Sequence, residues 1–258
     1  MKATVLLILF FLCAGFFADA QKLPNKQETG VYAPANVKID GSAKEWSENF
    51  SAYNHATEIY YTMANDADNL YLVFKATEAA VIQKIVTGGL SLSVSPVEKK
   101  TDMPPVTMTY PVVPFLFSQV NYALKPAAPL SDSQVMAINR KINDHLKEIK
   151  ITGIKSIPDS SVSIYNDLGI KGAQHVDNQK AYTCEVVLPL KFVRQMINSQ
   201  GTFAYRVQVT GIDLKTTKII SGRATDAPPA PSDSAVPHGM EYDISPTYFS
   251  ALYTLAKP

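Results

Sequence analysis

The chain reads V-K-I-D-G-S-A-K-E-W from Val37 to Trp46 and E-I-Y-Y-T-M-A-N-D-A-D-N-L-Y-L-V-F-K-A-T from Glu58 to Thr77. Apolar and polar residues alternate over Ile59–Met63 and again over Leu70–Ala76, as is typical of half-buried β-strands. The segment between them, N-D-A-D-N, favours a turn because Asp and Asn hydrogen-bond their own main chain. This stretch therefore predicts a β-hairpin.

Further strand patterns follow along the chain. They are Leu90–Val94, Ala181–Leu188, Phe203–Ile212 and Lys218–Ser221. Short strands between polar turns, with few helical patterns, indicate an antiparallel all-β protein rather than alternating strands and helices. We expect a jelly-roll-like β-sandwich that occupies residues 21–258 as a single domain, with a Pro-rich and helical insertion at about 97–160.

Two parts of this insertion depart from the strand pattern. Met103–Pro129 is rich in proline and aromatic residues. Because proline cannot donate to a sheet ladder, we expect a covering loop or an edge there rather than a central strand. From Ser131 to Ile149, apolar residues recur at three- and four-residue spacing behind a capping Ser or Asp, which predicts an amphipathic helix. That helix either covers one end of the sandwich or binds a partner.

The N-terminal residues have the pattern of a secretory signal peptide. Lys2 precedes the apolar run Thr4–Phe17, which ends in Ala18-Asp19-Ala20. We expect cleavage after Ala20 and a secreted or periplasmic protein. Cys13 would allow a lipid anchor, but Leu12 precedes it where a small residue is required. No later apolar run is long enough to predict a membrane span.

The remaining composition excludes several classes of protein. The chain has 24 Lys and Arg against 23 Asp and Glu, and these charges are largely scattered, so a nucleic-acid partner is not expected. After cleavage Cys184 is the one remaining thiol, which excludes an intrachain disulfide. It lies in an apolar strand pattern, so we expect a buried, unreactive thiol.

The order of several motifs resembles the family 9 carbohydrate-binding modules and the β-sandwich domains grouped with them. These motifs are Asp40-Gly41, the Glu-Trp pair at Trp46, the alternating hairpin, Tyr-x-x-Glu-x-x-x-Pro over Tyr182–Pro189, and P-T-Y-F-S-A-L-Y-T-L over Pro246–Leu255. The resemblance covers nearly the whole mature chain. It implies a non-catalytic, carbohydrate-binding β-sandwich with an accessory role in carbohydrate degradation, and it implies that Trp46 packs in the core.

The sugar site of that family is largely unmatched, because neither of its two sugar-stacking Trp residues is present. Its members clamp a sugar between two Trp rings, and this chain has Val86–Gly89 and His238, Met240 and Tyr242 at the corresponding places. Tyr rings also stack on apolar sugar faces. We therefore expect a ligand site on the rim formed by the last long loop and the insertion, with candidate residues Arg223, Asp226, Tyr242, Tyr110 and Phe115. The alternative is a scaffold that contacts proteins through residues 103–149.

Metal binding and catalysis have weaker patterns. The resemblance allows a structural calcium ion, for which the candidate ligands are Asp66, Asp68, Asp167, Asp226, Asp233 and Asp243. The segment Asp66–Asn69 lacks the Gly and Glu of an EF-hand loop, so turn chemistry is the other interpretation of its carboxylates. The four histidines form no zinc motif and no nucleophile elbow occurs, so we expect no enzymatic activity.

Overall fold

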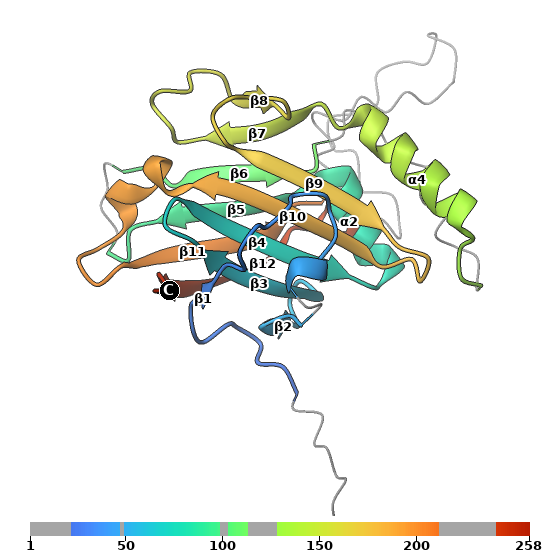
Figure 1. Ribbon diagram of the computed structural model, residues 1–258, viewed down its shortest axis with the longest axis horizontal. Coiled ribbons are helices and arrows are strands. Elements are labelled where there is room, and N and C mark those ends of the chain that lie inside the picture. The colour runs from blue at the N-terminus through green and yellow to red at the C-terminus, as the bar shows by residue number, and fades with distance from the viewer. Residues whose placement is uncertain (1–21, 47–48, 99–102, 113–127, 212–240) are drawn as a thin grey trace, which may run out of the picture.

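The structure is a computed structural model that describes residues 22–46, 49–98, 103–112, 128–211 and 241–258 (Figure 1). Over these residues, twelve strands form two sheets that pack face to face, and pairing within the sheets is mostly antiparallel. The predicted all-β sandwich is therefore confirmed.

The first sheet, called sheet A, contains the predicted hairpin. Its strands are β1 (Val31–Tyr32), β2 (Ala52–Asn54), β3 (Ile59–Asn65), β4 (Asn69–Ala76), β9 (Lys171–Val176) and β10 (Tyr182–Pro189). They lie in the order β1-β3-β4-β10-β9, and β2 also pairs with β3. Only β1, within this described sheet, runs parallel to its neighbour. The pairing of β4 with β10 brings together two segments separated by about a hundred residues of chain.

The second sheet, called sheet B, corrects one prediction. Its strands are β5 (Leu90–Ser95), β6 (Val106–Tyr110), β7 (Glu148–Thr152), β8 (Ser161–Ser163), β11 (Thr202–Val209) and β12 (Thr247–Thr254). Their order is β12-β11-β5-β6-β7-β8. The covering loop expected over Met103–Pro129 is wrong at β6, which lies between β5 and β7. Pro105 and Pro111 flank this strand without interrupting its ladder, so they limit its length rather than prevent it.

The amphipathic helix of the insertion is present as α4 (Asp132–His145). Ser131 caps it, and Ser131 and Gln134 exchange the hydrogen bonds of a capping box. The helix ends earlier than predicted, because Ile149 belongs to β7. Asn139 forms two hydrogen bonds of 2.8 Å with the main chain of Val176, so α4 covers the free edge of β9.

A second helix, α2 (Ala79–Gly88), was not predicted. Its buried residues Val81, Ile82, Ile85 and Val86 have helical spacing. Gly89 ends the helix at a φ of 80°, and its N–H donates to the carbonyl of Ile85 at 2.8 Å. The shorter helical segments are η1 (Lys44–Trp46), η2 (Leu190–Phe192), η3 (Arg194–Met196) and α5 (Glu241–Ile244).

Alternate residues of β10 belong to two different hydrophobic clusters. Tyr182, Cys184 and Leu188 lie in the main core between the sheets. Val187 lies in a second cluster on the opposite side of sheet A, together with Ala33, Ala43, Trp46 and Phe50. Cys184 is fully buried, and burial raises the pKa of its thiol well above the ordinary value, in agreement with the predicted buried thiol. We call the side of sheet A that carries this second cluster its outer face.

Candidate functional site

A buried glutamate fixes the N-terminal segment onto the outer face of sheet A. Oε2 of Glu185 accepts hydrogen bonds from the main-chain N–H groups of Asp40 and Gly41, at 3.1 and 2.9 Å. Its Oε1 accepts the indole N–H of Trp46 at 2.9 Å. Trp46 is also packed against Tyr71 and Val73 in the second cluster, so the structure confirms its expected role in packing.

Glu185 is fully buried, and this burial affects its ionisation. Burial raises the pKa of its carboxyl above the ordinary value, although the hydrogen bonds from Trp46, Gly41 and Asp40 act in the opposite direction. Gly41 has a φ of 86°, and any side chain there would clash with the main chain of Gln174. The position and direction of residues 40–44 are therefore determined by contacts with β9 and β10.

Beyond this covered region, a row of polar side chains crosses the outer face. Thr183 on β10 is paired with Lys75 on β4 and with His175 on β9. We call these three residues the polar row. On β4 and β10 they lie two residues from Val73 and Glu185, which the N-terminal segment covers. The polar row begins where this cover ends.

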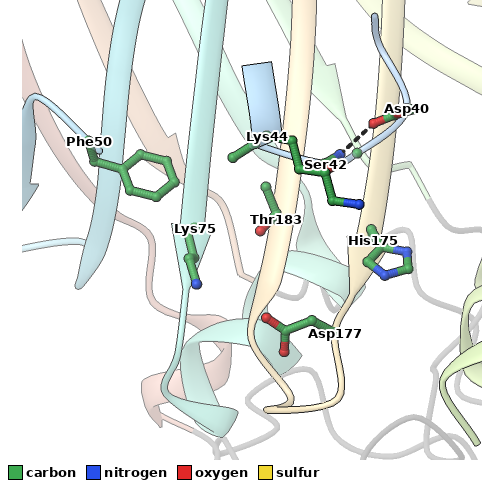
Figure 2. Close-up of a pocket in the computed structure, with 10 residues that line it drawn as sticks. Asp40, Ser42, Lys44, Phe50, Lys75, His175, Asp177 and Thr183 are labelled. Atoms are coloured by element: carbon green, nitrogen blue, oxygen red, sulfur yellow. Dashed lines mark hydrogen bonds between the residues drawn. The ribbon is translucent and has the colours of Figure 1, made fainter. Parts of the chain in front are cut away.

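A hollow of about 330 Å³ lies over the polar row (Figure 2). Lys75, Thr183 and His175 form its floor on adjacent strands, while Ser42 and Lys44 lie along one side and Asp177 along the other. Phe50 closes the end next to β3. The remaining lining residues are Asp40, Gly41 and Ala43. A volume near 300 Å³ is at the small end of the range for ligand pockets.

The charged groups around this hollow differ in their hydrogen bonding. Oδ1 of Asp40 accepts the N–H of Ser42, and Oδ1 of Asp177 accepts the N–H of Ala181, each at 2.8 Å. Among the residues that the structure describes, the side chains of Lys44, Lys75 and His175 make no hydrogen bond or ion pair. The carboxylates thus have partners in local turns, whereas the two lysines and the histidine have none among the described residues.

Aromatic rings continue the polar row across the sheet. Tyr60 on β3 is paired with Lys75, and Tyr53 on β2 is paired with Tyr60. The centroids of the Tyr53 and Tyr60 rings are 4.6 Å apart, and those of Phe50 and Tyr60 are 6.1 Å apart. One register line therefore joins Tyr53, Tyr60 and the three residues of the polar row over five strands. It places half-buried aromatic rings beside hydrogen-bond donors.

The sequence-predicted rim residues do not meet in this hollow. Tyr110 is only 2% exposed and lies in the core between the sheets, so its side chain does not lie on an exposed rim. Its ring packs over Gly172, because alternation in β6 turns it inward. Tyr242 is 42% exposed, and its hydroxyl donates to Glu58 at 3.0 Å. Arg223, Asp226 and Phe115 lie outside the described residues.

The acidic residues of the predicted hairpin act in its turn. Oδ1 of Asp66 accepts the main-chain N–H groups of Asp68 and Asn69, both at 2.7 Å, and its Oδ2 accepts the hydroxyl of Tyr71 at 2.6 Å. Across the described residues, no group of three or more His, Cys, Asp or Glu side chains has an arrangement suited to a metal ion. Asp226 and Asp233 lie outside this part of the chain, so structural calcium stays a prediction.

Comparisons with models of known protein families, with curated proteins and with solved structures found no match for this chain. Within the described residues, no helix is both long enough and apolar enough to cross a membrane.

Sequence reasoning did not identify the residues of the hollow. The histidines were judged only by their spacing along the chain, and Lys75 was treated as part of a strand. One signal was available, because Lys75 is a charged residue inside the apolar run Leu70–Ala76. Its neighbours Thr183 and His175 become apparent only through the pairing of β10 with β4 and β9.

Proposed function

We propose that this protein is a secreted or periplasmic, non-catalytic carbohydrate-binding module whose ligand lies on the outer face of sheet A. The observation that carries the proposal is the line of Tyr53, Tyr60, Lys75, Thr183 and His175, aligned by strand register beside a hollow. The motifs shared with family 9 modules and the signal-peptide pattern support the same function and location.

The chemistry of a saccharide suits this combination of groups. A pyranose ring has an apolar C–H face, which packs on the flat face of an aromatic ring, and hydroxyl groups around its edge. Phe50 and Tyr60 offer the aromatic side. Thr183, Lys75 and His175 offer hydrogen-bonding groups at the level of the sheet. A ring on Phe50 and Tyr60 would place its polar edge over the polar row.

Isothermal titration of residues 21–258 with a panel of mono- and oligosaccharides tests the proposal. We expect one class of sugar to bind. Tyr60→Leu and Thr183→Val should each lower the affinity for that sugar by roughly fivefold or more, because each removes one aromatic ring or one hydrogen bond. Leu retains apolar bulk without a flat ring, and Val retains the shape of Thr without its hydroxyl.

Two variants provide the controls. Tyr165→Leu removes a ring that is 78% exposed and does not line the hollow, so affinity should not change. Tyr242→Ala distinguishes the outer face from the sequence-predicted rim, because only a rim site would lose affinity. A sugar that binds wild type, Tyr60→Leu and Thr183→Val equally would contradict the proposed site, and a panel without any binding would contradict the proposed function.

A further inference from the structure

We infer that the ligand of the hollow is an acidic saccharide, whose carboxylate is bound by Lys75 and Lys44. This inference rests on the proposed function and names the class of sugar. It starts from the groups that line the hollow, which include two lysines, one histidine and two aspartates. The two aspartates each accept a turn hydrogen bond, whereas the described part of the chain provides no partner for either lysine.

The position of Lys75 strengthens the argument. It is half-buried in β4, between the fully buried Phe74 and Ala76, and its side chain lies on the floor of the hollow (Figure 2). Ion pairs that form in a hollow are less screened by salt and water than pairs on an open surface. A carboxylate that enters the hollow would therefore pair with Lys75 on its floor.

The second lysine approaches from a different element. Lys44 is exposed at the start of η1, above the hollow, while Lys75 comes from the sheet below (Figure 2). The chain before Lys44 is held by the hydrogen bonds of Asp40 and Gly41 to Glu185. A group between the two lysines would also be near Thr183 and His175, which can donate further hydrogen bonds.

The aromatic end of the hollow then limits the shape of the ligand. Phe50 and Tyr60 lie on the β3 side of Lys75, and the polar row extends to the other side. A ligand that uses both sides needs a ring with an apolar face and an anionic substituent at its edge. Uronic acid residues have this form. A small inorganic anion would use the lysines but would gain nothing from the rings.

The test compares sugars that differ only in charge. Titrations would use oligomers of galacturonate, glucuronate and mannuronate together with their methyl esters, which keep the sugar ring but mask the carboxylate. We expect at least one acid to bind roughly ten- to a hundredfold more tightly than its ester, the range for a hydrogen bond to a charged group. Raising the salt concentration should lower the affinity for the acid and leave the affinity for the ester unchanged.

Charge-matched variants complete the experiment. Lys75→Gln and Lys44→Gln should each reduce the affinity for the acid without affecting the ester, whereas Lys155→Gln, which changes the net charge equally outside the hollow, should have no effect. Equal binding of acids and esters, or neutral sugars binding while no acid does, would overturn the inference and leave the proposed function standing. Displacement of the acid by an equimolar amount of inorganic phosphate would overturn it as well. No binding by any sugar would refute both the acidic-saccharide inference and the proposed function.

Discussion

At the residue scale, Glu185 connects the motifs that carried the family resemblance. Asp40-Gly41, Trp46 and the Glu of Tyr-x-x-Glu-x-x-x-Pro are distant in sequence, yet they meet in one set of three hydrogen bonds. This contact explains why those residue types occur together. An acceptor with two oxygens satisfies two main-chain donors and one indole donor, and Gly is required where the chain approaches β9.

Replacement of Glu185 by Gln tests this connection. The amide would direct an N–H group at one of the three donors, so we expect a loss of about 1–3 kcal/mol in the free energy of unfolding, the cost of an unsatisfied buried group. Urea denaturation at neutral pH measures it. Glu148→Gln, at an exposed position on β7, serves as the matched control and should change stability by less than about 0.5 kcal/mol.

The pH dependence of stability provides a second test at the same residue. Because burial raises the pKa of Glu185, the folded protein binds this proton more tightly than the unfolded chain does. The stability that this proton contributes is fully present below the ordinary carboxyl pKa of about 4.3 and is lost as pH rises through the folded value. Glu185→Gln should remove this loss, and an unchanged pH profile in the variant would contradict the assignment.

Asp66 has the opposite linkage. Burial acts to raise its pKa, but the hydroxyl of Tyr71 and the main-chain N–H groups of Asp68 and Asn69 outweigh this effect, so the pKa is lowered. Its stabilising contribution is present above the ordinary value of about 3.9 and is lost as pH falls through the folded value. We expect Asp66→Ala to cost about 1–3 kcal/mol at pH 7 and less at pH 3. Thermal unfolding with Asp68→Ala as control measures this, and an equal cost at both pH values would disprove it.

At the element scale, strands with a clear hydrophobic pattern were predicted correctly, and strands with a concealed pattern were not. The β3–β4 hairpin and β10 were predicted because their alternation or apolar character is strong and polar residues bound them. β6 was not, because the proline content of Met103–Pro129 concealed five residues with an alternating burial pattern. The end of α4 was placed too late because Leu146 and Ile149 continue the apolar spacing although the chain turns into β7.

The same elements determine what deletion of the insertion would do. Met103–Ile149 supplies β6, α4 and the start of β7, and it contributes Met108, Ile142 and Ile149 to the main core. We expect the chain without residues 103–149 to show no cooperative unfolding transition by circular dichroism.

Met136, which is 67% exposed on α4, allows a test of the protein-contact alternative that leaves the core intact. Met136→Gln should fold normally. For the deletion variant, a sharp unfolding transition would contradict the core role of the insertion.

At the scale of the whole molecule, the site arises from incomplete coverage of one sheet. Residues 31–46 and Phe50 cover part of the outer face of sheet A, and the polar row lies beyond that cover. Individual strands could be predicted from the sequence, but the site could not, because its residues come from positions 40 to 183 and align only through strand register. Register depends on the whole sandwich rather than on any local pattern.

The most direct test of the account maps a saccharide onto the molecule. Amide NMR spectra of residues 21–258 would be recorded while a binding sugar from the panel is titrated. We predict that the largest shifts fall on Lys75, His175, Thr183 and the main chain of residues 42–44, while Glu241–Ile244 do not change. Shifts concentrated at Glu241–Ile244 instead, with the outer face of sheet A unaffected, would contradict the central claim.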